Sequence, residues 1–80
     1  MLLNEFEIKL NTLDKVRKFS EIVSVMEEDI DIIVGRYVVD AKSVLGILSI
    51  DLNRMLRVKI HTSDIDRCKE FQEEMKEFLV

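Results

Sequence analysis

The sequence predicts a single α+β domain over residues 1–80, with helices packed on one face of a sheet. Apolar residues recur at every second position in some segments and at every third or fourth position in others. Neither a proline nor a Gly/Ser-rich linker interrupts this pattern, and the two glycines are Gly35 and Gly46. The chain is therefore expected to fold as one unit in the order strand–helix–strand–strand–helix–strand–helix.

The first strand and the first helix are expected within residues 5–26. Phe6, Ile8 and Leu10 alternate with charged residues, which is the period of a strand with one buried face. Asn11 or Thr12 can then cap a helix. The apolar stripe of this helix recurs at three- and four-residue spacing and comprises Leu13, Val16, Phe19, Val23 and Met26.

A β-hairpin is expected in the middle of the chain. The segment DIDIIV places Ile30, Ile32 and Val34 on one side of a strand, and Gly35 marks a tight turn. The segment RYVVD supplies the second strand of the hairpin. Asp31 is expected on the solvent side of the sheet, without a catalytic partner.

Residues 54–62 alternate again and predict the last strand, with His61 on its outward side. The pair Ser63 and Asp66 resembles a capping box at the start of the last helix. Cys68 is expected to be a small core residue of this helix rather than a nucleophile. The whole inner stripe is expected to be Ile65, Cys68, Phe71, Met75, Phe78 and Leu79.

Composition and charge exclude several classes of function. The net charge of -4 disfavours nucleic acid, whose phosphates attract a basic surface. One histidine and one cysteine cannot form a structural zinc site or an internal disulfide, so no metal or cofactor is expected. The amino-terminal segment MLLNEFEIKL is not typical of a signal peptide, and no window approaches the roughly 18 apolar residues of a membrane span. We therefore expect a cytoplasmic protein that does not contact the membrane.

The segment KSVLGILSI, residues 42–50, resembles HPr, the histidine-containing phosphocarrier of the bacterial sugar phosphotransferase system. Lys42, Ser43, Gly46 and Ser49 agree in identity with the family pattern, and the aliphatic positions agree in type. The segments DIDIIVGRYVVDA and RVKIHTSDID also resemble the family, although the turn glycine lies one place early. The resemblance implies an HPr-like open-faced β-sandwich, which has a four-stranded antiparallel sheet of order 1-4-2-3 and three helices on one face.

The family's phosphoryl transfer depends on a histidine just before the first helix, and this chain has none there. Counting back from Ser43 without gaps places that position at Thr12 and the family's arginine at Asp14. A phosphothreonine ester is stable, whereas the P–N bond of phosphohistidine is labile, and Asp14 would repel a phosphate by ~1 kcal/mol at ~4 Å even in water. A second register places Lys15 and Arg17 at these positions and still supplies no histidine. We therefore expect neither an enzyme nor a phosphocarrier.

Ser43 and the aliphatic residues that follow it form the candidate site. The resemblance implies that an HPr kinase/phosphorylase phosphorylates Ser43 and that Val44, Leu45 and Leu48 dock a transcriptional regulator of catabolite repression. Catabolite repression HPr, a branch of the family without the histidine, keeps only this serine. Helix capping alone also explains a serine at this place. A two-turn helix buries about half of its aliphatic residues, so an exposed patch is expected opposite Ile47 and Ile50.

The sequence thus predicts a regulatory or protein-interaction module linked to sugar uptake. The same exposed aliphatic patch could instead form the interface of a homodimer. Two alternatives stay open. One is a ferredoxin-like (ACT-type) regulatory domain that binds a small molecule as a dimer, and the other is a structural unit without regulation. Strand order separates HPr from the ACT-type domain, because it is 1-4-2-3 in the first and 4-1-3-2 in the second.

Overall fold

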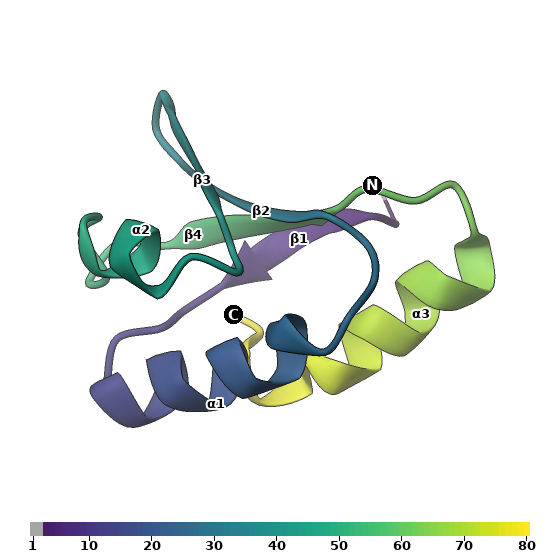
Figure 1. The fold of residues 1–80 in the computed structure, drawn as a ribbon, viewed down its shortest axis with the longest axis horizontal. Helices are drawn as coiled ribbons and strands as arrows, with labels where there is room; N and C mark the ends of the chain where they lie inside the picture. The colour runs from purple at the N-terminus through teal and green to yellow at the C-terminus, as the bar shows by residue number, and fades with distance from the viewer. Residues whose placement is uncertain (1–2) are drawn as a thin grey trace.

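The computed structural model describes residues 3–80 as a four-stranded antiparallel sheet covered by three helices (Figure 1). The strand order is β1-β4-β2-β3, which confirms the predicted α+β class and the predicted order 1-4-2-3. The ferredoxin-like order 4-1-3-2 is not observed. The elements are β1 (Glu5–Ile8), α1 (Leu13–Ser24), β2 (Ile30–Val34), β3 (Tyr37–Asp40), α2 (Val44–Leu48), β4 (Leu56–Ile60), α3 (Ile65–Glu74) and the 3₁₀ helix η1 (Lys76–Phe78).

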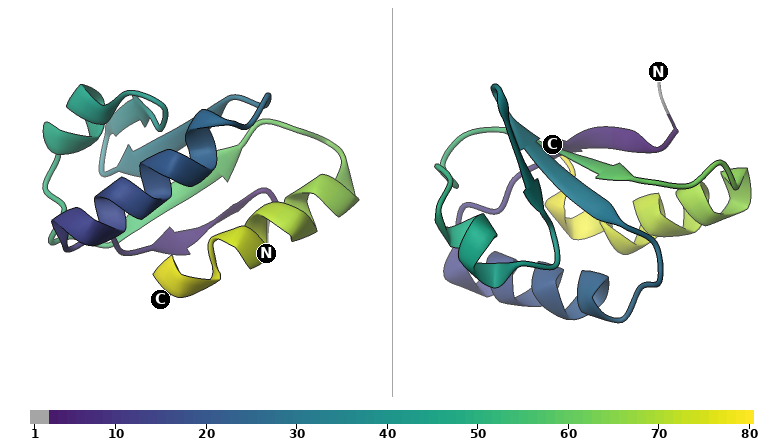
Figure 2. Two further views of the ribbon diagram at one scale, coloured as in Figure 1. Left: turned by 60° about the horizontal axis from the view of Figure 1, so that its bottom comes forward. Right: turned by 45° about the horizontal axis from the view of Figure 1, so that its top comes forward.

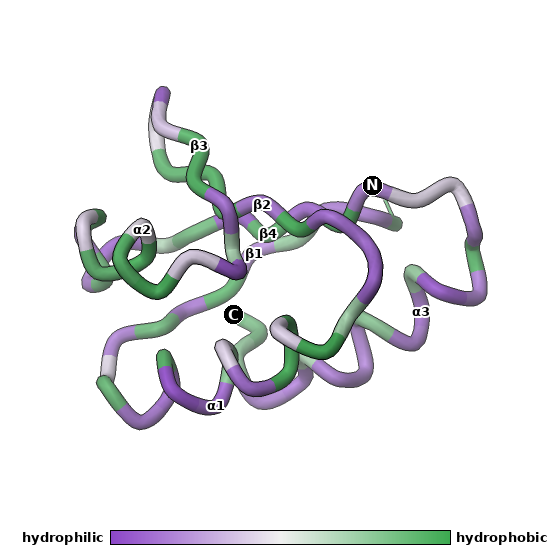
Figure 3. Tube along the Cα trace, viewed as in Figure 1, coloured by the Kyte–Doolittle hydropathy of each residue, from purple (hydrophilic) through white to green (hydrophobic). Residues whose placement is uncertain are grey.

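The helices lie on one side of the sheet. Helices α1 and α3 run across this face, and α2 lies at one end of it beside β3 (Figures 1 and 2). Hydropathy alternates along the strands, and much of α1 and α3 is hydrophilic (Figure 3). The side chains that β2 and β4 turn toward the helices are buried, and they are Ile30, Ile32, Val34, Leu56, Val58 and Ile60.

Two pairs of aromatic side chains pack in the core. One pair joins a helix to the sheet, and the other joins two helices. Phe6 of β1 packs against Phe71 of α3, with ring centroids 5.6 Å apart. Phe19 of α1 meets Phe78 of η1 edge-to-face at 5.9 Å. Aromatic pairs of this geometry contribute about 0.5–1.5 kcal/mol beyond the area that they bury. Cys68 is buried in the same core, as its position on the stripe predicted.

The hairpin turn between β2 and β3 confirms the role expected for Gly35. Val34 pairs with Tyr37, so the loop has two residues, Gly35 and Arg36. Gly35 has a φ of 58°, which a residue without a Cβ adopts at low cost. The turn therefore fixes the register of the two strands.

Both long helices reach the core one turn later than predicted. Leu13 and Ile65 were expected on the buried stripes, yet both side chains are exposed. Each is the first residue after an N-cap, and the buried residues begin three positions on, at Val16 and Cys68. The apolar period alone does not show where packing against the sheet starts.

The last helix also begins and ends differently from the prediction. Asp64, not Ser63, is the N-cap of α3, because its Oδ1 accepts hydrogen bonds from the N–H groups of Asp66 (3.0 Å) and Arg67 (3.2 Å). Leu79, expected on the buried stripe, is partly exposed. The chain has left η1 there and is extended, and Leu79 bridges to Ile8 beside β1.

Within residues 3–80, none of the helices has both the length and the apolar character needed to cross a bilayer.

Candidate protein-docking site

Helix α2 exposes three aliphatic side chains and buries a fourth. The exposed fractions are 49% for Val44, 82% for Leu45 and 50% for Leu48, whereas Ile47 is fully buried. Ile50 is partly buried against the core, on the side expected for it. We call Val44, Leu45 and Leu48 the α2 patch. The length of the helix predicted an exposed patch opposite Ile47, and the resemblance to HPr named these three residues. Their docking role stays a prediction.

Ser43 is the N-cap of α2. Its Oγ accepts a hydrogen bond from the N–H of Gly46 at 3.1 Å, and its carbonyl accepts one from the N–H of Ile47 at 3.0 Å. Ser43 is exposed, so its hydroxyl is open to solvent while it caps the helix. Asp40 forms the turn before it, accepting hydrogen bonds from the N–H groups of Lys42 (2.9 Å) and Ser43 (3.0 Å).

Each of the four identities shared with the HPr pattern has a local structural role. Lys42 Nζ donates to the carbonyl of Met26, just after α1, at 2.7 Å. A Cβ on Gly46 would lie 3.2 Å from Ser43 Oγ, so the glycine leaves room for the cap. Ser49 Oγ donates to the Gly46 carbonyl at 2.6 Å. The residues at 42–50 that resemble HPr are therefore also the residues that shape the corner, by which we mean the turn of the chain from β3 into α2.

Thr12, where the ungapped count from Ser43 places the histidine of HPr, is the N-cap of α1. Thr12 Oγ1 accepts a hydrogen bond from the N–H of Lys15 at 3.1 Å. Asp14 forms ion pairs with Arg17 (2.8 Å) and Lys18 (3.4 Å), and its hydrogen bonds to these two residues lower the pKa of its carboxyl. The start of α1 thus carries a carboxylate beside the threonine.

His61 has a carboxylate partner that the sequence did not reveal. Its Nε2 lies 2.7 Å from Asp31 Oδ2, and its backbone N–H donates to the Asp29 carbonyl. The pair forms because β2 and β4 are neighbours and Asp31 faces Lys59, two residues before His61. A sequence shows this proximity only once strand order and register are known. The end of β4, which His61 follows, and the start of α1, which Thr12 precedes, lie at opposite ends of the molecule (Figure 1).

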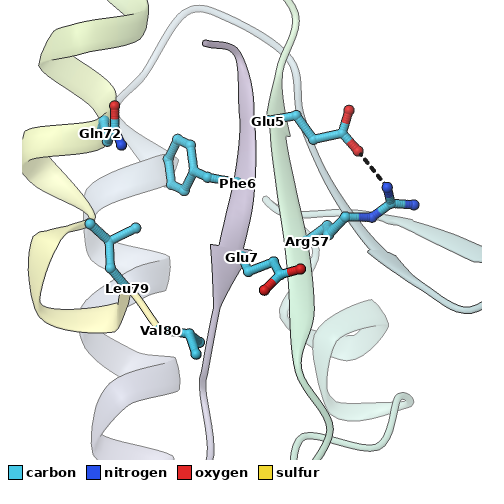
Figure 4. A pocket seen from close by; sticks show the side chains of 7 residues that line it. All are labelled: Glu5, Phe6, Glu7, Arg57, Gln72, Leu79 and Val80. Carbon is cyan, nitrogen blue, oxygen red and sulfur yellow. Dashed lines mark ion pairs between the residues drawn. The ribbon is translucent and has the colours of Figure 1, made fainter. Parts of the chain in front are cut away.

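A shallow pocket lies beside β1, and its polar side chains do not converge (Figure 4). Phe6 points toward α3, whereas Glu5 and Glu7 point to the other side of the strand, where Glu5 pairs with Arg57 at 3.2 Å. Within residues 3–80, no three His, Cys, Asp or Glu side chains are grouped so as to hold a metal ion. The pocket offers apolar contact and no constellation of catalytic groups.

A scan against models of known protein families finds no match, and a search of curated proteins finds none either. The resemblance to HPr therefore rests on residues 42–50 and on the strand order described above.

Proposed function

We propose that this chain is a non-catalytic, HPr-like protein-interaction module that docks a protein partner through the α2 patch. The observation that carries the proposal is the exposure of Val44, Leu45 and Leu48 together on a helix of five residues. Exposed aliphatic side chains that lie side by side are typical of contact sites. The strand order and the residues shared with HPr support a role in the regulation of bacterial sugar uptake.

Ser43 is the proposed regulatory position. A phosphate there would add a charge of about -1.5 to -2 next to Val44, at the border of an apolar surface. Such a change favours a partner with cationic groups and disfavours a wholly apolar one. An HPr kinase/phosphorylase would be the modifying enzyme and a transcriptional regulator of catabolite repression the partner, both in the bacterial cytoplasm.

The modification is tested by incubating the protein with ATP and an HPr kinase/phosphorylase and mapping the phosphate by mass spectrometry. We expect phosphate on Ser43, none in Ser43→Asn, and unchanged labelling in Ser49→Ala. Asparagine is an efficient N-cap, so Ser43→Asn removes the acceptor hydroxyl without removing the helix cap. Absence of phosphate from the parent protein would remove the regulatory part of the proposal.

The docking role is tested by the binding of the phosphorylated protein to the catabolite regulator, measured by calorimetry. Leu45→Lys should weaken binding at least tenfold, because it places an ammonium at the centre of the α2 patch. Val25→Lys is the matched control, since Val25 and Leu45 have the same exposed fraction of 82% and Val25 lies outside the patch. Equal affinities of the two variants would refute docking through α2.

The proposal also excludes phosphoryl transfer. Incubation with phosphoenolpyruvate and enzyme I should leave the protein unlabelled, because Thr12 and Asp14 replace the groups that accept and hold the phosphate. An acid-labile label on this protein would overturn this part of the proposal.

A further inference from the structure

Strand β3 is an edge of the sheet whose side chains are largely exposed. Tyr37 and Val38 have exposed fractions of 66% and 60%, and β2 is the neighbouring strand on one side only. The β2–β3 hairpin projects from the layer of helices (Figure 1). The segment Tyr37–Asp40 contains neither proline nor lysine, residues that commonly protect edge strands from pairing with another chain.

The backbone of Val38 faces away from the sheet. Ala41 N–H donates to the Ile30 carbonyl of the β2 side at 2.8 Å. Because backbone groups alternate in direction along an antiparallel strand, Tyr37 and Val39 also turn toward β2, while Val38 and Asp40 turn outward. The N–H and C=O of Val38 are therefore available to a further strand.

We propose that β3 pairs antiparallel with β3 of a second copy of this chain, with Val38 opposite Val38 at the two-fold axis. Each Val38 then donates its N–H to the Val38 carbonyl of the other copy. The two sheets become one sheet of eight strands, and the same surface serves both copies, as an isologous dimer requires. This interface is separate from the α2 patch and does not depend on the function proposed for it.

Charge complementarity selects the second copy as the occupant. With Val38 at the axis, Arg36 of each copy, in the turn just before β3, lies at the end of the paired strands next to Asp40 of the other copy. The ion pairs of residues 3–80 include neither Arg36 nor Asp40. Asp40 instead faces Asp31 across the β2–β3 register, and like charges opposite each other are unfavourable in a sheet. In each copy, the Arg36 of the other copy would offset this repulsion.

The same charges exclude the neighbouring registers. A shift of two residues in one direction places Val38 opposite Arg36, and a shift in the other direction places it opposite Asp40. Either shift separates Arg36 from Asp40 of the other copy. After a shift of one residue, the outward N–H and C=O groups of one strand lie opposite residues of the other strand whose N–H and C=O groups point away. The two strands then form no hydrogen bonds with each other.

The test is sedimentation velocity of the full chain up to millimolar concentration, together with amide hydrogen exchange. We expect a monomer–dimer equilibrium in which the Val38 amide becomes more protected as concentration rises. Val38→Lys should yield a monomer, whereas Val25→Lys should leave the dimer unchanged. A monomer at every concentration, or a dimer broken by Leu45→Lys and not by Val38→Lys, would overturn the proposal.

A pair of charge variants tests the register. Arg36→Glu and Asp40→Lys should each be monomeric alone, because each places like charges opposite each other twice. Mixed in equal amounts they should form a heterodimer, since Glu meets Lys on one side and Asp meets Arg on the other. Circular dichroism of each variant confirms that it is folded. A mixture of folded variants that stays monomeric would contradict the register.

Discussion

The two edges of the sheet, β1 and β3, differ in how they are protected. At β1 the carboxy-terminal segment covers part of the edge, because Lys9 N–H donates to the Phe78 carbonyl at 2.9 Å and Leu79 bridges to Ile8. The rest of that edge carries Glu5 and Glu7, whose like charges disfavour pairing with a second copy.

At β3, the segment leading into α2 covers only the end of the edge, where Ser43 N–H donates to the Asp40 carbonyl at 3.0 Å, and the strand carries no pair of like charges within Tyr37–Asp40. Its outward backbone groups centre on Val38, and its flanking charges are of opposite sign. An exposed edge strand can therefore still be selective, because the placement of its charges favours some partner strands over others.

Loss of the cover on β1 should have the largest effect. Phe78→Ala removes a buried ring that packs edge-to-face on Phe19, and such truncations cost about 3–5 kcal/mol of unfolding free energy. Urea unfolding measures the loss, and exchange of the Lys9 amide should accelerate as the segment detaches. Val80→Ala is the control, because Val80 lies in the same segment and is exposed. An equal loss in both variants would show that Phe78 does not hold the segment.

A change at the turn should affect the β3 side selectively and by a smaller amount. Gly35→Ala forces a side chain into φ 58°, at a cost of roughly 1–2 kcal/mol. Crowding is not the cause, because the added Cβ would meet only the Arg54 guanidinium, at 3.9 Å. Gly35→Asn should not recover the loss, since only Gly35 has a positive φ in this two-residue loop, the type II′ pattern whose first position favours glycine. Urea unfolding would contradict the prediction if alanine equalled glycine.

The smallest expected effect concerns the anchoring of α3, the helix on the β1 side. Arg67 bonds Glu28, which precedes β2, at 2.9 Å and lowers the pKa of that carboxyl from its ordinary 4.5. The pair therefore stabilises the fold fully above pH 4.5, and the contribution disappears as pH falls through the lowered pKa. Arg67→Met should cost about 1 kcal/mol at pH 7 and less at pH 3. Urea unfolding at both pH values measures this, and a pH-independent loss would contradict it.

Periodicity predicted the strands and helices because burial alternates with the geometry of each element. It located the buried positions of β2 and β4. Residue type predicted Ser43 as the N-cap of α2 and left Asn11 or Thr12 for α1, of which Thr12 is the cap. Periodicity did not reveal the strand order, which came from the resemblance at residues 42–50. It also misplaced Leu13 and Ile65, since a stripe of apolar residues does not show where contact with the sheet begins.

The candidate site was predictable only where it depends on local structure. An exposed aliphatic patch follows from a short helix with one packed face, whereas the choice of Val44, Leu45 and Leu48 came from the resemblance to HPr. The contact of His61 with Asp31 and the outward direction of Val38 depend on register, which pairs residues distant in the chain. Such contacts can be identified only once the folded sheet is known.

The corner at residues 42–50 places its own demands on the sequence. Lys42, Ser43, Gly46 and Ser49 each satisfy a backbone group or make room for one, so folding alone gives a reason to retain all four. The same four residue types can therefore recur wherever a strand turns into a short helix in this way, whatever the chemistry of the protein. Agreement at these positions therefore reports shared architecture, and shared chemistry has to be established elsewhere in the chain.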